Sequence, residues 1–261
     1  MKSISVFGGN GFLGRAICKE AIQRGWTVNS VSRSGKPVQS NEPWVEKVNW
    51  VKGDVFQPKT YESVLKTSDA VVHSLGLIWE NQDYKKLINL ESSGASNPLK
   101  TLAQAFQVFT SSKGSNPMEK EVFNTYDGLN HQSAIVLAEA VAENLSDEWP
   151  KSFPFVYISA DFKSPSPAEY LKSKQITEIE LYEMQPQLRP IFMRPGFMYD
   201  ENNPRNMRHD VKKILELIGK IDTKNLIGLP QTVSIQKVAR SILDHVAEQG
   251  FVGPVNMDQM Q

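Results

Sequence analysis

The chain has 261 residues, with 29 basic and 29 acidic side chains and a formal net charge of zero. Its hydrophobic fraction of 40% is ordinary for a globular protein, and its length suffices for one large α/β domain. The charge balance argues against a nucleic-acid-binding protein, because no net positive field attracts phosphate backbones. One cysteine and four scattered histidines exclude a disulfide framework and predict no metal site.

The apolar stretches bear on membranes and targeting. None approaches the roughly 20 apolar residues that a membrane-spanning helix needs. The first apolar run begins near residue 3, so we expect no cleavable signal or transit peptide, because its removal would take the first strand. This argument does not apply to an internal targeting signal, which is not cleaved.

Short apolar runs alternate with helical patterns, which is typical of a parallel sheet with helices on both faces. We predict strands at 3–7, 27–31, 48–52, 70–74, 155–159 and 190–194. We predict helices from Phe12 to a stop at Gly25, and near 59–67, 130–145 and 169–184. The pattern indicates a Rossmann-type, doubly wound α/β fold in a single domain over residues 1–261.

Two regions depart from this alternation. Residues 77–125 are long for one connection and rich in Ser, Gly and Asn, so we expect a flexible insertion, with a helix near 99–107. Residues 197–235 are expected to form a small C-terminal substrate lobe. The lobe includes an amphipathic helix at 205–221, whose apolar face contains Val211, Ile214, Leu215 and Ile218. A strand at 232–234, a helix at 235–248 and a strand at 254–257 complete the prediction.

A glycine-rich segment, GGNGFLG at 8–14, joins the first predicted strand to the first helix. Gly8 permits a tight turn, Gly11 lets a pyrophosphate approach the backbone, and Gly14 allows close helix packing. The helix N-terminus would then present its amides and its positive dipole end to the phosphates. The segment therefore predicts a dinucleotide site, which also includes Asn10, Phe12 and Leu13.

The end of the second strand indicates which dinucleotide is bound. An NAD-specific site has an acidic residue here, whereas Arg33 suits the 2′-phosphate of NADP(H). Ser32 and Ser34 can add hydrogen bonds to that phosphate, and Arg15 is a further candidate. The alternative is a solvated surface arginine.

Two further strand ends complete the predicted cofactor site. Asp54 and Val55 follow the third strand, where a carboxylate can lie near the adenine amino group. Leu75 and Gly76 follow the fourth strand and can form the floor under the adenosine ribose. The alternative is that each pair belongs to an ordinary loop and contacts no ligand.

A candidate catalytic group comes later in the chain. Ser159 ends the fifth predicted strand, and Tyr170 and Lys174 share one face of the next helix. We expect the lysine ammonium to lower the pKa of the phenol, so that Tyr170 can exchange a proton near neutral pH. Ser159 would orient a substrate oxygen, and Lys174 would also hold the nicotinamide ribose.

Together these features resemble the short-chain dehydrogenase/reductase superfamily, in its extended and atypical branch. The resemblance rests on Gly8, Gly11, Gly14, Asp54, Gly76, Ser159, Tyr170, Lys174 and the segment Arg194-Pro195-Gly196. It implies that Pro195 and Gly196 contact the cofactor. It also implies that Asn130 supports an active-site water or the lysine.

A closer resemblance is to fungal mitochondrial members of this superfamily that act in coenzyme Q biosynthesis. These members are related to the NADPH-binding accessory subunit of respiratory complex I. The resemblance covers the chain except about 80–125 and is carried by VFGGNGFLG, SVSRSGK, VVHSLG, NHQSAIVLAEA, YISAD, SKxxxEIEL, RPGFMYDE and TVSIQKVARSIL. It implies a mitochondrial protein on the matrix side of the inner membrane, acting with the coenzyme Q synthesis complex.

Three functions stay open at this stage. The first is an NADP(H)-dependent oxidoreductase that transfers hydride to or from a quinone-like or carbonyl carbon. The second is a non-catalytic accessory protein stabilised by NADPH. The third, a sugar-nucleotide epimerase, is disfavoured because SADFKSPSPAEY at 159–170 lacks the second Ser or Thr common in those enzymes.

Several polar residues have simpler interpretations. We expect Cys18 to be a buried inert thiol, His73 a hydrogen-bonded core residue, and His131 a capping or surface residue. The 205–221 helix presents Arg205, Arg208, Lys212, Lys213 and Lys220 opposite its apolar face. These cations can contact anionic inner-membrane lipid, but we favour a helix packed on the core with solvated lysines.

Overall fold

The computed structural model describes residues 2–77, 125–145, 152–163, 166–203, 207–221 and 231–260. Its main sheet has seven strands in the order β3-β2-β1-β4-β5-β6-β9, and every neighbouring pair is parallel. The strands are β1 Ser3–Phe7, β2 Thr27–Ser32, β3 Asn49–Lys52, β4 Ala70–His73, β5 Phe153–Ile158, β6 Leu188–Met193 and β9 Gly253–Val255. The doubly wound Rossmann-type fold predicted from the sequence is confirmed.

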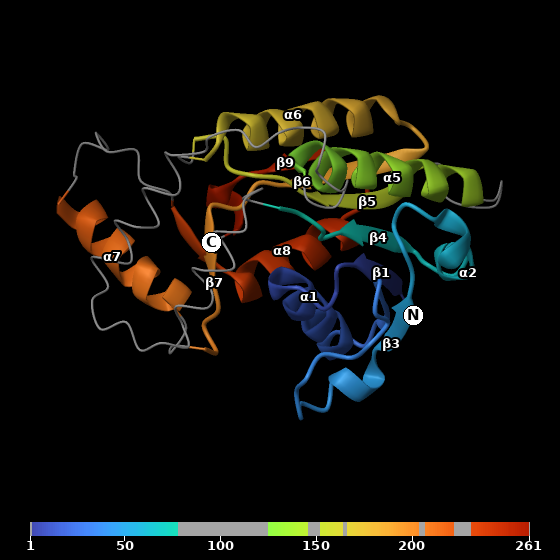
Figure 1. The fold of residues 1–261 in the computed structure, drawn as a ribbon, viewed down its shortest axis with the longest axis horizontal. Helices are drawn as coiled ribbons and strands as arrows, with labels where there is room; N and C mark the ends of the chain where they lie inside the picture. Colours follow the sequence, from blue (N-terminus) through green and yellow to red (C-terminus); the bar gives the residue numbers. More distant parts are fainter. Residues whose placement is uncertain are drawn as a thin grey trace.

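Helices cover both faces of this sheet (Figure 1). On one face lie α1 Phe12–Gln23 and α8 Ile235–Ala247, and on the other lie α5 Ser133–Asn144 and α6 Ala168–Glu183. Successive strand residues feed the two cores alternately: in β5, Val156 and Ile158 face α1 and α8, whereas Phe155 and Tyr157 face α5. Burial on both faces explains why these strands are continuous apolar runs in the sequence.

Some predicted boundaries differ from the structure. The helix expected at 59–67 is a 3₁₀ turn, Pro58–Thr60, followed by the short α2, Glu62–Leu65. The helix expected from residue 130 begins earlier, because a π-helical turn, Asp127–Gln132, leads into α5. The strand expected at 254–257 ends at Val255 and is followed by a 3₁₀ turn, Met257–Met260.

A small second sheet lies beside the main one. β7 Phe197–Tyr199 pairs in parallel with β8 Thr232–Ser234, and α7 Met207–Ile221 lies between them in the chain. Arg208 attaches α7 to its surroundings, because it donates to the carbonyl of Met198 and its guanidinium lies 4.6 Å from the ring centre of Phe12. Lys212 lies over the Tyr199 ring. Lys212, expected to be a solvated lysine, therefore contacts an aromatic ring of the protein, and so does Arg208.

The expected insertion at 77–125 lies outside the described residues except for Leu77 and Thr125, and so does the helix expected near 99–107. Among the helices that are described, none combines the length and the apolar character needed to cross a membrane.

The glycine-rich segment allows α1 to approach the end of β1 closely. Gly8 has φ +89°, a left-handed conformation that side chains disfavour. A Cβ atom on Gly14 would lie 2.1 Å from the carbonyl oxygen of Gly8, inside any allowed contact. The helix can therefore pack against this turn only if residue 14 has no side chain.

We expect Gly14→Ala to destabilise the protein by about 1–3 kcal/mol, because the turn must move to admit the methyl group. Gly25→Asn is the matched control: Gly25 also has a positive φ, but a Cβ atom there would meet no atom within 4 Å, and Asn tolerates this conformation. Urea unfolding checks both variants. Equal stability losses would show that the close approach of α1 carries no special cost.

Candidate functional site

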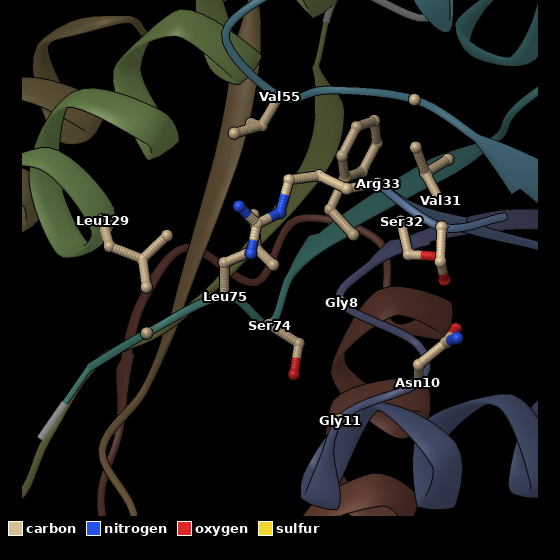
Figure 2. A pocket seen from close by; sticks show the side chains of 14 residues that line it. Gly8, Asn10, Gly11, Val31, Ser32, Arg33, Val55, Ser74, Leu75 and Leu129 are labelled. Carbon is tan, nitrogen blue, oxygen red and sulfur yellow. The ribbon is translucent and has the colours of Figure 1, made fainter. Parts of the chain in front are cut away.

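A cavity of about 440 Å³ opens beside the end of β1 and between the loops that follow β2, β3 and β4 (Figure 2). The strand order reverses between β1 and β4, and in doubly wound sheets ligands bind at that crevice. Nine of the predicted cofactor residues line this cavity: Gly8, Asn10, Gly11, Ser32, Arg33, Ser34, Val55, Leu75 and Gly76. The first half of the predicted site therefore forms one continuous surface.

Arg33 gives this cavity its charge. Figure 2 shows its side chain extending over the cavity, with the guanidinium on the side of Leu75 and Leu129. Among the described residues that line the cavity, none is acidic. The lining therefore suits an anionic group better than a cationic one.

Short polar side chains hold the loop after β2 in place. Asn10 donates to the carbonyl of Lys36 (2.6 Å), and the hydroxyl groups of Ser32 and Ser34 accept from the backbone amides of Gly35 and Lys36. This part of the cavity is thus braced by the protein's own hydrogen bonds.

Other predicted cofactor residues lie away from the lining. Phe12, Leu13 and Gly14 belong to α1, and Leu13 is buried in the core behind the turn. The Asp54 carboxylate accepts from the amide of Phe56 and the side chain of Gln57, so it caps its own turn. Pro195 and Gly196 are not among the lining residues, and the Gly196 amide donates to the sulfur of Met257.

The sequence reasoning missed several residues of the lining. Phe7, Val31 and Ser74 are strand-end residues that follow directly from the strand predictions, and Gly53 is the residue before Asp54. Leu129 has no such signal, because it comes from the π-helical turn and reaches the cavity only through the tertiary fold.

A second cluster lies next to the cavity and contains Lys174. Its ammonium is buried, donates to the carbonyl of Ile158 (2.7 Å) and lies 4.5 Å from the ring centre of Tyr157. The Tyr170 ring centre lies 5.8 Å from the same nitrogen. A Cβ atom on Gly76 would lie 3.6 Å from it, so Gly76 separates this cluster from the cavity.

The pKa values of the cluster differ from the sequence-based expectation. Burial lowers the pKa of Lys174 to about 7, and the nearby charge of Glu178 opposes this shift only in part. Burial raises the pKa of Tyr170 well above its ordinary value, and the neighbouring Tyr126 adds to the rise. The expected lowering of the phenol pKa is therefore wrong for this arrangement, because burial of the phenol raises its pKa.

Ser159 follows β5 and is 3% exposed. Its amide donates to the carbonyl of Met193, but its hydroxyl group has no hydrogen-bond partner among the described residues. A buried hydroxyl without a partner costs free energy, which makes Ser159 a candidate hydrogen-bond donor to a ligand oxygen.

Asn130 connects the π-helical turn before α5 to the chain after β4 by hydrogen bonds. Its side chain bonds both backbone groups of Leu77, accepting from the amide (2.8 Å) and donating to the carbonyl (3.0 Å). Its own carbonyl accepts from the hydroxyl of Tyr157 (2.7 Å). Asn130 therefore fixes the chain just after Gly76, and it reaches Lys174 through Tyr157 rather than by a direct hydrogen bond.

Two simpler interpretations agree with the structure. Cys18 is fully buried, and burial raises the pKa of its thiol to about 12, as expected for an inert thiol. His73 is fully buried and bonds the Ser133 hydroxyl (2.8 Å); burial and the charge of Lys174 lower its pKa to about 3. His73 is therefore a neutral core residue.

His131 joins the π-helical turn to α6. Its two ring nitrogens lie 3.0 Å from carboxylate oxygens of Asp127 and Glu180. Partial burial lowers the pKa of His131, but the two carboxylates outweigh burial and raise the pKa above its ordinary value. The protonated imidazole thus stabilises the contact between these two helices.

The fold and the cavity together define a class of protein. A doubly wound parallel sheet with a glycine-rich turn at the strand-order reversal is a nucleotide-binding type of fold. Residues 4–123 match the NAD dependent epimerase/dehydratase family. Over 276 aligned positions the chain is 37% identical to MIOREX complex component 2 of Saccharomyces cerevisiae, covering 98% of this chain and 97% of that protein.

Two solved structures share the fold, each with a TM-score of 0.58. UDP-glucose 4-epimerase from Bifidobacterium longum, in complex with NAD+ and UDP, is 18% identical and aligns with 98% of this chain and 78% of its own. FolM alternative dihydrofolate reductase 1 from Brucella canis, complexed with NADP, is 14% identical and aligns with 97% of this chain and 90% of its own.

The chain therefore belongs to the same family as MIOREX complex component 2, and its residues 4–123 form a segment of the NAD dependent epimerase/dehydratase type. MIOREX complex component 2 is its relative over nearly the full length of both proteins.

His131 generates a prediction about pH. Because the pKa is raised in the folded state, the stabilising contribution is fully present below the unfolded pKa of about 6.5 and is lost as pH rises through the folded value. We expect His131→Gln to lower the melting temperature more at pH 6 than at pH 8.5. Thermal unfolding at both pH values checks this, and a deficit that is constant or grows with pH would contradict it.

Proposed function

We propose that this protein binds NADP(H) in the cavity and acts as an oxidoreductase of the short-chain dehydrogenase/reductase type. The observation that carries the proposal is the juxtaposition of two features. The described lining of the cavity contains Arg33 and no acidic side chain, and Gly76 lies between the cavity and the ammonium of Lys174. A dinucleotide spans such a crevice, with its adenosine half near β2 and its nicotinamide half near β5.

The fit to NADP(H) rests on chemistry at the end of β2. A guanidinium pairs with a phosphate through two parallel hydrogen bonds, whereas the ribose hydroxyl of NAD favours a carboxylate. Arg33 would hold the 2′-phosphate, and Ser32 and Ser34 would add donors beside it. The amides after Gly8 and Gly11 would face the pyrophosphate at the N-terminus of α1.

The residues near β5 would handle the substrate. A bound nicotinamide supplies or accepts hydride at a quinone-like or carbonyl carbon. Ser159 would donate to the substrate oxygen, since its hydroxyl is buried and unpartnered among the described residues. Tyr170 would transfer the accompanying proton, and Lys174 would hold the nicotinamide ribose.

We place this activity in coenzyme Q biosynthesis, in mitochondria and on the matrix side of the inner membrane. The support is the resemblance of segments such as SVSRSGK and RPGFMYDE to fungal proteins of that pathway. The full-length similarity to a component of the MIOREX complex supports an association with partner proteins. That these partners belong to the coenzyme Q synthesis complex is supported by the resemblance of the segments alone. A peripheral contact of α7 with the inner membrane is a weaker part of the proposal, because Arg208 and Lys212 contact aromatic rings of the protein.

A non-catalytic accessory protein is the second candidate. It is favoured by the raised pKa of Tyr170, which leaves the phenol a poor acid in the ligand-free protein. In that case NADPH stabilises the native state by mass action and is not consumed.

We expect Arg33→Ala to weaken NADPH binding roughly 10- to 150-fold, the cost of one charge-assisted hydrogen-bonded group, and to leave NADH binding nearly unchanged. Arg24→Ala is the control, because Arg24 pairs with Glu20 and Asp244 away from the cavity. Calorimetric titration with both nucleotides checks this. Equal weakening of NADH and NADPH would contradict a 2′-phosphate contact at Arg33.

We expect Tyr170→Phe to lower NADPH oxidation by a short-chain quinone at least about 100-fold, because the proton donor is lost, while NADPH affinity changes little. Absorbance of the reduced nicotinamide and nucleotide titration measure the two quantities separately. Tight NADPH that the wild-type protein never oxidises would favour the accessory role. Undiminished turnover by the variant would remove Tyr170 from the mechanism.

A further inference from the structure

A partly buried ion pair lies next to the Lys174 cluster. Glu178 is 6% exposed and lies one helical turn after Lys174 on α6. Arg194 follows β6 and donates two hydrogen bonds to this carboxylate, from Nε to Oε1 at 3.0 Å and from Nη2 to Oε2. Both carboxylate oxygens are thus directed at one guanidinium, in the two-pronged geometry that Arg forms and Lys does not.

Arg194 connects three segments that carry the proposed site. Through Glu178 it holds α6, on which Tyr170 and Lys174 lie. Its guanidinium also lies 4.7 Å from the ring centre of Phe162, in the segment between Ser159 and Tyr170. Its backbone amide donates to Val255 in β9. One residue therefore ties α6 and the preceding loop, through its side chain, to the edge strand β9 of the main sheet, through its backbone.

The same pair determines what surrounds Lys174. In the part of the chain that the structure describes, the titratable groups near its ammonium are His73 of β4, Tyr157 of β5, and Tyr170 and Glu178 on its own helix. Glu178 is the carboxylate in this set, and it is engaged by Arg194. Lys174 donates instead to the neutral carbonyl of Ile158.

We propose that Glu178 and Arg194 form a positioning pair for the site: Arg194 holds helix α6 in place and keeps the Glu178 carboxylate from forming a salt bridge with Lys174. The functional role of Lys174 in this proposal rests on the proposed function, but the geometry of the pair does not depend on any ligand. A lysine without a carboxylate partner changes protonation more readily than a salt-bridged one.

The two partners can be removed separately, and they act on Lys174 in opposite directions. Arg194→Met removes a positive charge and frees Glu178, which favours the charged lysine. Glu178→Gln removes the negative charge, which favours the neutral lysine. We expect the ratio of neutral to charged Lys174 at fixed pH to fall roughly tenfold in the first variant and to rise roughly tenfold in the second.

The experiment is an NMR titration of the ligand-free protein labelled at lysine Cε, with Lys174 assigned from the signal missing in Lys174→Arg. Arg24→Met and Glu20→Gln are matched controls, because they break a similar pair on α1 and should leave Lys174 unchanged. Arg194→Lys restores the charge without the two-pronged grip, so its shift should be smaller than that of Arg194→Met. If Arg194→Met fails to fold, Glu178→Gln decides, since Gln keeps the size of Glu and one acceptor for Arg194.

Opposite shifts in the two variants, with unshifted controls, support the proposal. Shifts in the same direction, or none in Glu178→Gln, overturn it and leave the pair a structural contact only. Because the titration uses no nucleotide, its outcome is independent of the proposed function. Failure of the wild-type protein to bind NADPH would overturn that function and leave the Lys174 result standing.

Discussion

The close approach of α1 to the end of β1 is the constraint on which the site depends. The approach requires a left-handed Gly8 and no side chain at residue 14. It places the N-terminal end of α1 beside the cavity, where the helix dipole would stabilise an anion. The same helix start holds the small sheet, because Phe12 receives the Arg208 guanidinium of α7. The glycine-rich turn and the contact with α7 are therefore both located at the start of α1.

Burial of Lys174 is the second constraint, and it works against stability. The pKa of Lys174 falls from 10.5 in the unfolded chain to about 7 in the folded protein. Below pH 7 the lysine is protonated in both states, and keeping its charge in the buried site costs about 5 kcal/mol of folding free energy. The cost declines as pH rises between these two values. A carboxylate beside the ammonium would offset it, but Glu178 is engaged by Arg194. Destabilised ionisable groups of this kind concentrate at functional sites.

The sequence predicted the parts of the molecule that depend on local patterns. Continuous apolar runs predicted six strands of the main sheet, because strands buried on both faces need apolar residues throughout. The glycine spacing predicted the turn at the cavity. Contacts that depend on side-chain direction were missed: the helical spacing of Tyr170 and Lys174 predicts one shared face, but not that Lys174 turns to the Ile158 carbonyl. Leu129 and the strand β7 were missed because neither has a periodic signal of its own.

The two halves of the candidate site differ in how their polar groups are satisfied. Near β2, the side chains of Asn10, Ser32 and Ser34 bond the protein's own backbone, so that half is formed before any ligand arrives. Near β5, the Ser159 hydroxyl is buried and has no partner among the described residues. A protein that used its nucleotide only for stability would gain by filling that position with a methyl group, since an unsatisfied buried hydroxyl costs about 1–3 kcal/mol. Under the proposed function a substrate oxygen would be the hydrogen-bond partner of this hydroxyl, whereas a protein that only stored its cofactor would supply none.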